Sequence, residues 1–213
     1  MRKAERGFTL VELAIVLVII GIILGAILKG QEVIKNAQIK RLLSDLRGLE
    51  AVVWTFRDRY GRMPADCNSD GLIDPTTNNT TGGLDNNPDS GFCGDTGFTS
   101  TDRDAPWAEL KRAGILPNSD NRKLSLTQFG GRFFIGRAYV NSGQYRNAIS
   151  IANIPCFAAK AIDSSIDGAL DAGDGRIREL TGAYSARNSS DAWTNCTTED
   201  TTVNIVYFFE KSP

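Results

Sequence analysis

The sequence contains no histidine among its 213 residues, and its formal net charge is −1 at pH 7. The absence of histidine excludes Ser-His-Asp triads, histidine-ligated zinc or haem and the usual proton shuttle near neutral pH. A net charge near zero provides no global attraction to nucleic acid, so no nucleic-acid partner is expected. The sequence also lacks a phosphate-binding loop and a Gly-x-Ser-x-Gly nucleophile motif. We therefore expect a protein that is not an enzyme.

Polar side chains are absent from residues 13–28, which form a long apolar run. Counted from Phe8, this run is about 31 Å long as a helix, which is enough to cross the hydrocarbon core of a bilayer. One carboxylate, Glu12, lies near its start, and residues 1–7 contain three basic side chains. Basic residues hold a flanking segment in the cytoplasm. The sequence therefore predicts a single membrane-spanning helix over residues 8–28.

Three other interpretations of this run are weaker. A secretory signal peptide ends in a small-residue cleavage site, and residues 25–30 contain no good match to one. A plain signal anchor gives no reason for Glu12, because a carboxylate at a helix centre costs about 2.5–3.5 kcal/mol on insertion scales and less near the end. A buried helix of a soluble protein is rarely apolar on all sides over this length.

The segment Gly7-Phe8-Thr9-Leu10-Val11-Glu12-Leu13 resembles the cleavage and methylation motif of type IV prepilins and type II secretion pseudopilins. The resemblance implies that a prepilin peptidase cuts between Gly7 and Phe8 and that Phe8 is then N-methylated. It also implies that Glu12 pairs with the N-terminal amine of a neighbouring subunit during assembly. A carboxylate among apolar helices is tolerated when a cation neutralises it, and cleavage creates such a cation one helical turn away.

A second pattern follows the apolar run and predicts that the helix continues. Apolar residues recur three or four positions apart, which places them on one face of a helix. They are Ile39, Leu42, Leu46, Leu49, Val53, Phe56 and Tyr60. Gly61 and Pro64 then end the helix. A two-stranded coiled coil also shows such a stripe, but this one lasts only about three heptads and a large domain follows to cover it.

The resemblance implies a type IV pilin-like α+β fold, in which the long N-terminal helix packs on an antiparallel β-sheet head with long loops. We expect four parts: a leader over 1–7, a membrane and polymerisation helix over 8–28, its amphipathic continuation over 29–61 and a globular head over 62–213. Within the head, the patterns predict helices over 106–113 and 156–163, and strands over 124–126, 132–140, 148–154 and 203–209.

Residues 66–104 form an acidic loop that contains eight aspartates and one basic residue, Arg103. Its first nine residues have the pattern D-x-N-x-D-G-x-x-D, which is typical of calcium loops because alternating oxygen ligands and a glycine turn wrap a hard cation. The predicted ligands are Asp66, Asn68, Asp70 and Asp74. Thr77 stands where an EF-hand has its bidentate glutamate, so a complete EF-hand is not predicted. The alternative is a solvated turn stabilised by its own Asx hydrogen bonds.

Four cysteines in a chain that carries an export-like N-terminus indicate two disulfides formed in an oxidising compartment. Three pairings are compatible with the sequence. We favour Cys67 with Cys93 and Cys156 with Cys196, because each pair closes a moderate loop within one region. A zinc site is disfavoured because no Cys-x-x-Cys pair occurs.

These patterns and the resemblance predict a structural subunit of a type IV pilus (fimbrium) or a type II secretion pseudopilus. The resemblance implies a single-pass protein of the bacterial inner membrane with a periplasmic head, which then enters a periplasmic or extracellular filament. Its expected partners are the prepilin peptidase, other pilin subunits and the inner-membrane assembly platform. The alternative is a membrane-anchored, calcium-dependent, adhesin-like binding protein that does not polymerise. Glu12 discriminates between the two, because a simple anchor gains nothing from it.

Overall fold

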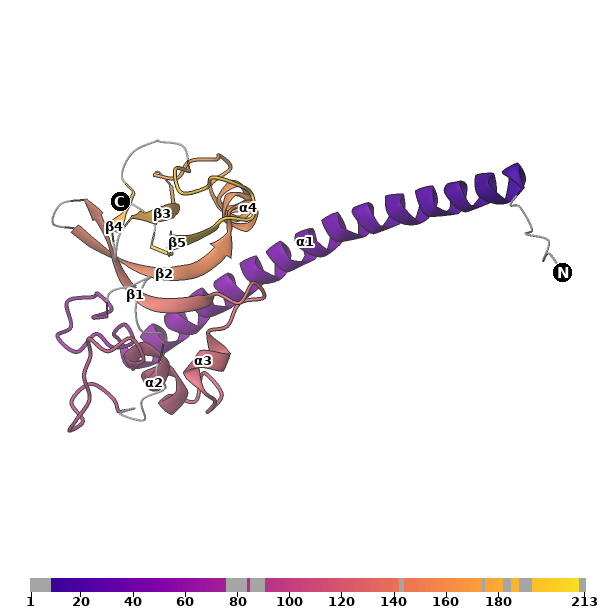
Figure 1. The fold of residues 1–213 in the computed structure, drawn as a ribbon. Helices are drawn as coiled ribbons and strands as arrows, with labels where there is room; N and C mark the ends of the chain where they lie inside the picture. The colour runs from indigo at the N-terminus through magenta and orange to yellow at the C-terminus, as the bar shows by residue number, and fades with distance from the viewer. Residues whose placement is uncertain are drawn as a thin grey trace. The chain divides into compact units, whose positions relative to one another are not determined.

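The structure is a computed structural model, and it describes residues 9–75, 84, 91–141, 144–173, 175–181, 185–187 and 193–210. The chain divides into two compact units, Met1–Lys40 and Arg41–Pro213. Figure 1 shows its elements, which are α1 (Leu10–Tyr60), α2 (Ala105–Arg112), α3 (Asn121–Leu124), β1 (Arg132–Asn141), β2 (Gln144–Pro155), α4 (Cys156–Ile166), β3 (Ile177–Thr181), β4 (Ser185–Ala186) and β5 (Thr202–Phe208).

The helix α1 belongs to both units, since their boundary falls inside it and inside the predicted amphipathic segment 29–61. In the second unit it buries five positions of the apolar stripe, namely Leu42, Leu46, Leu49, Val53 and Phe56. The helix ends at Tyr60, as predicted, because Gly61 adopts a left-handed conformation with φ of 72°. The Gly61 N–H donates a hydrogen bond to the Arg57 carbonyl oxygen at 2.8 Å, which satisfies one of the last helical acceptors.

The sheet of the second unit has the strand order β1-β2-β5-β3-β4. The neighbours along this order pair in antiparallel fashion, with Ile135 opposite Ile149 and Ile151 opposite Ile205. One parallel pair, Tyr139 with Ser185, joins β1 to β4 and closes the order into a barrel. A long N-terminal helix followed by an antiparallel sheet confirms the predicted α+β class and fits a pilin-like fold. The closure was not predicted.

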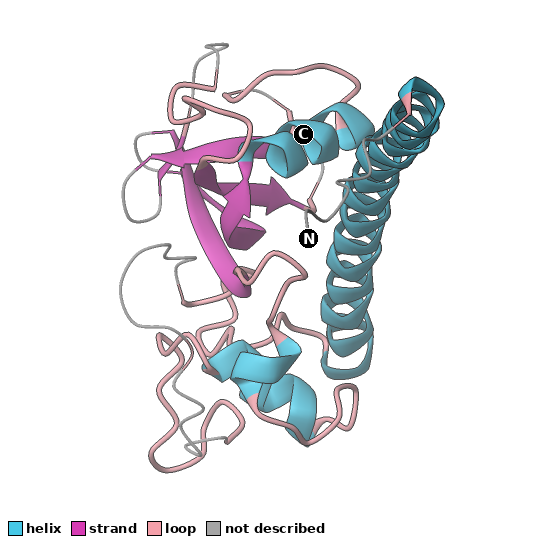
Figure 2. Cartoon of the chain, turned by 45° about the vertical axis from the view of Figure 1, so that its right-hand side comes forward, coloured by secondary structure: helices cyan, strands magenta, loops and turns pink. Residues whose placement is uncertain are grey.

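Short helices lie at both ends of this sheet. In Figures 1 and 2, α2 and α3 lie at one end and α4 lies at the other.

The buried carboxylate of Glu109 in α2 connects several segments, because it accepts hydrogen bonds from the Arg62 guanidinium at 2.7 and 2.8 Å and from the backbone N–H groups of Ala65 and Cys93. The exit of α1, the acidic loop and α2 therefore share one buried ion pair.

The predicted strand over 124–126 was wrong. Its first residue instead ends α3, and Leu126 forms an isolated bridge with Arg132. The reason is local, because the Asp120 side chain accepts a hydrogen bond from the Arg122 N–H at 2.8 Å and caps the helix. Beside this bridge, Gly131 has no substitute, since a Cβ there would lie 1.9 Å from the Ala152 carbonyl oxygen.

Two disulfides are present, and they are the two pairings that the sequence favoured. Cys67 is bonded to Cys93 with an S–S distance of 2.10 Å, and Cys156 is bonded to Cys196 at 2.04 Å. The first bridge links the two sides of the acidic loop. The second joins the start of α4 to the segment that precedes β5. No cysteine remains free.

Candidate functional site

The predicted cleavage site, Gly7 and Phe8, lies outside the described residues. Thr9, which directly precedes α1, and Glu12, in the first turn of α1, bond to each other. The Thr9 backbone N–H and hydroxyl both donate to Glu12 Oε2, at 2.8 and 2.9 Å. In return, the Glu12 N–H donates to Thr9 Oγ1 at 3.3 Å. This reciprocal pair is a capping box, with Thr9 as the N-cap of α1 and Glu12 three residues later.

Sequence reasoning identified Glu12 and missed Thr9. The signal was present, because a threonine followed three residues later by a glutamate, directly before an apolar run, is the capping-box pattern. The family resemblance implies a role for the glutamate alone. The structure adds that the carboxylate of Glu12 is held by its own chain.

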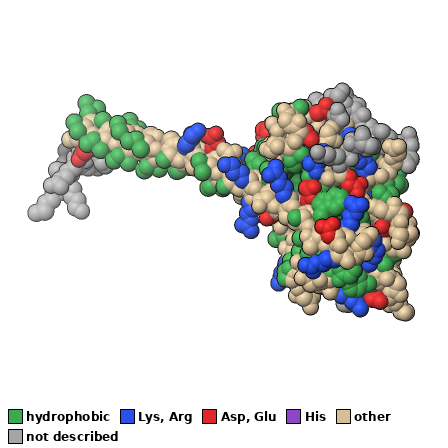
Figure 3. Space-filling model, turned by 180° about the vertical axis from the view of Figure 1, so that it is seen from behind, with side chains coloured by type: hydrophobic (Ala, Val, Ile, Leu, Met, Phe, Trp, Pro, Cys, Tyr) green, Lys and Arg blue, Asp and Glu red, His purple; other side chains and the backbone are tan. Residues whose placement is uncertain are grey.

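The first unit exposes a long apolar helix surface. An 18-residue window of α1 has a mean hydropathy of 3.0, and none of it is buried by the rest of the chain. By length and composition this helix is able to cross a membrane. Figure 3 shows apolar side chains along the visible face of the start of α1. Such a surface needs a bilayer or other apolar helices around it.

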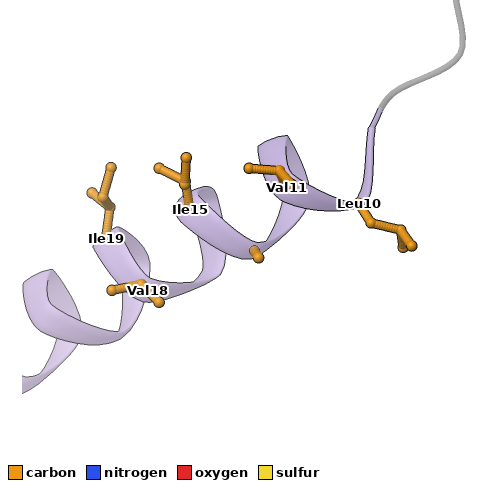
Figure 4. A pocket seen from close by; sticks show the side chains of 6 residues that line it. Leu10, Val11, Ile15, Val18 and Ile19 are labelled. Atoms are coloured by element: carbon orange, nitrogen blue, oxygen red, sulfur yellow. The ribbon is translucent and has the colours of Figure 1, made fainter.

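The hollow along the first turns of this helix is open rather than enclosed. Figure 4 shows Leu10, Val11, Ile15, Val18 and Ile19 projecting from the first turns of α1 into open space. Their exposed fractions run from 50% for Ile19 to 86% for Leu10. The arrangement is therefore a packing surface and is unsuited to enclosing a small molecule.

Three of the four predicted calcium ligands share one turn, but their oxygen atoms accept backbone hydrogen bonds. Asp66 accepts from the N–H groups of Asp70 and Gly71, at 3.2 and 3.1 Å, and it is almost fully buried. Asn68 Oδ1 accepts from the Asp70 N–H at 3.1 Å, and Asp70 Oδ1 accepts from the Leu72 N–H at 2.8 Å. These are the contacts of an Asx-rich turn.

The fourth predicted ligand, Asp74, lies 3.7 Å from the Arg137 guanidinium, in an ion pair. Thr77 lies outside the described residues. Among the residues that the structure describes, no group of three or more His, Cys, Asp or Glu side chains is arranged to hold a metal ion. Calcium binding at this loop stays a prediction.

One buried carboxyl group outside these sites titrates near neutral pH. Asp163 in α4 is fully buried and accepts a hydrogen bond from the Asp171 N–H at 2.8 Å. Burial raises the pKa of this carboxyl to about 7, and the negative charges of Asp167 and Asp171 act in the same direction. Asp167 itself accepts from the N–H groups of Arg176 and Ile177, so it stabilises the loop that leads into β3.

The comparisons agree with the N-terminal motif. A family model described as a prokaryotic N-terminal methylation motif matches residues 2–28. Comparison with curated proteins and with solved structures gives no significant match. The chain therefore carries the prepilin-type cleavage and methylation motif, which supports a type IV pilin- or pseudopilin-like precursor. The apolar helix that follows the motif fits membrane anchoring.

Proposed function

We propose that this protein is a structural subunit of a type IV pilus or pseudopilus. A prepilin peptidase cuts it between Gly7 and Phe8, Phe8 is N-methylated, and the processed chain polymerises through α1. The observation that carries the proposal is the methylation motif at residues 2–28 together with an apolar helix that its own chain leaves exposed. A helix that is apolar all round fits a bilayer before assembly and a bundle of identical helices afterwards.

Glu12 favours association of this helix with the helix of a second subunit. In the bilayer a carboxylate is costly, and a cationic amine from a neighbouring subunit offsets that cost when the two come together. Cleavage at Phe8 supplies the amine. The partners in this proposal are the peptidase, further subunits and the inner-membrane assembly platform. The head faces the periplasm before assembly, and the filament is periplasmic or extracellular.

The substitution Glu12→Ala tests this assembly step. We expect the variant to be inserted in the membrane as well as the wild type but to enter filaments at least about tenfold less, because a charge pair of more than about 1.4 kcal/mol is lost. Filaments sheared from cells and membrane fractions are quantified by immunoblot. Glu32→Gln is the matched control, because it removes a carboxylate from the same helix outside the apolar run, where Glu32 pairs with Lys29. Equal incorporation of Glu12→Ala and wild type would contradict the pairing mechanism.

We propose calcium binding at the acidic loop as a second and separate property. It is supported by three oxygen-bearing side chains on one turn, Asp66, Asn68 and Asp70, two of which are exposed. The melting temperature of the detergent-solubilised protein is then expected to rise by a few degrees with millimolar calcium, and Asp70→Ala abolishes the rise. Equal melting with calcium and with a chelator counts against the site. It also removes the basis of the alternative function, an anchored calcium-dependent binding protein.

A further inference from the structure

The Thr9–Glu12 capping box lies entirely on the C-terminal side of the proposed cut. Its donors and acceptors are the Thr9 N–H, the Thr9 hydroxyl, the Glu12 carboxylate and the Glu12 N–H. Processing breaks the peptide bond between Gly7 and Phe8, which precedes every atom of the box. Neither cleavage nor methylation of the Phe8 amine removes an atom of the box. The same contacts are therefore available to the precursor in the membrane and to the mature chain.

A lipid environment makes these contacts more valuable than they are in water. The first N–H groups of any helix have no partner within the helix. In the hydrocarbon region, each unsatisfied backbone group costs several kcal/mol. The box satisfies the N–H groups of Thr9 and Glu12 and supplies the carboxylate with two donors. Threonine is suited to this role, because one hydroxyl both donates to the carboxylate and accepts from the Glu12 N–H.

The carboxylate uses only one of its oxygens in the box. Both Thr9 donors contact Oε2, at 2.8 and 2.9 Å. The second oxygen, Oε1, takes no part in these bonds. A carboxylate with two oxygens is able to accept from several donors at once. The box therefore fixes the direction of the carboxylate and leaves Oε1 for a further donor.

We propose that Thr9 is a positioning residue for assembly: it holds the Glu12 carboxylate at the first turn of α1, with Oε1 presented to the N-terminal amine of an incoming second copy of this chain. This inference rests on the proposed function. It adds that the acceptor is organised within each subunit before the subunits meet. Preorganisation lowers the entropy lost when the pair forms, so removal of the hydroxyl slows or weakens assembly even though the charge remains.

The first test does not depend on assembly. Amide hydrogen exchange is measured by NMR on the full chain in detergent micelles. Thr9→Val removes the hydroxyl with little change in shape, and the Glu12 N–H is expected to exchange about fivefold faster, as for the loss of one N-cap bond. Glu12→Ala is expected to accelerate exchange at the Thr9 N–H by a similar factor. Thr9→Ser keeps the hydroxyl and should match the wild type. Unchanged exchange at Glu12 in Thr9→Val overturns the inference.

The second test measures filament incorporation of the same variants in cells with an active prepilin peptidase. Thr9→Val is expected to reduce incorporation about fivefold, and Thr9→Ser restores it. In the double variant, Thr9→Val adds no further loss to Glu12→Ala, because Thr9 acts through the carboxylate. Incorporation of Thr9→Val at the wild-type level, with Glu12→Ala still defective, overturns the positioning role and leaves the proposed function intact. A Glu12→Ala protein that assembles normally overturns the proposed pairing itself. If Thr9→Val is not processed, the exchange experiment decides.

Discussion

Two buried carboxylates show how environment sets the cost of a charge. Glu109 is fully buried, yet the Arg62 guanidinium and two backbone N–H groups surround its oxygens. Asp163 is equally buried, but its neighbours include the carboxylates of Asp167 and Asp171. The first group is stabilised as an anion, and the second is destabilised as one. Burial and these neighbours raise the pKa of the Asp163 carboxyl to about 7.

The raised pKa of Asp163 predicts a pH-dependent stability. The pKa is 3.8 for an ordinary aspartate and about 7 in the folded protein, so the folded state binds the proton more tightly than the unfolded state. The contribution of this group is therefore fully present below about pH 4 and is lost as the pH rises to about 7. Asp163→Asn mimics the neutral form, and we expect it to raise the melting temperature more at pH 8 than at pH 5.

Melting curves from pH 5 to pH 8 measure this effect by circular dichroism. The matched control is Asp58→Asn, because Asp58 lies on an exposed face of α1. It should shift the curves equally at both pH values. A parallel shift for Asp163→Asn as well would show that its pKa is ordinary in the folded protein.

At the scale of elements, local patterns and the disulfide pairings were predictable, and the pairing of the short strands was not. The end of α1 and its buried stripe follow from helical periodicity and from Gly61, which are local signals. The strands β3 and β4 were not predicted, because β4 has two residues and its partners, such as Tyr139, are far away in the chain. Sheet pairing depends on neighbours that a sequence window does not contain. The capping box has a local sequence signal, because Thr9 and Glu12 are three residues apart directly before the apolar run.

The buried side chains in the second half of α1 are expected to contribute strongly to stability, so shortening one of them should destabilise the head. Leu46 is fully buried, and Leu46→Ala is expected to destabilise the head by about 2–5 kcal/mol, because it leaves a cavity. The adjacent Arg47 is exposed, and Arg47→Ala should change stability by less than about 0.5 kcal/mol. Urea unfolding of the two detergent-solubilised variants, followed by tryptophan fluorescence, compares them. Similar midpoints would contradict the packing of this face against the head.

At the scale of the whole molecule, two units that suit different surroundings share one helix. Among the described residues, the apolar window of the first unit is exposed, and the second unit has a buried core and two disulfides. A buried core and disulfides suit an oxidising aqueous compartment, while the exposed apolar helix suits a bilayer or a fibre. This division is what a membrane-stored filament subunit requires.

The most direct measurement is the intact mass and N-terminal sequence of the protein recovered from cells with and without an active prepilin peptidase. The account predicts a chain that begins at N-methylated Phe8 when the peptidase is active and that retains residues 1–7 when it is not. Reduction should add two hydrogens for each of the disulfides Cys67–Cys93 and Cys156–Cys196. A chain that still carries residues 1–7 in cells with an active peptidase would contradict the central claim that this protein is a processed filament subunit.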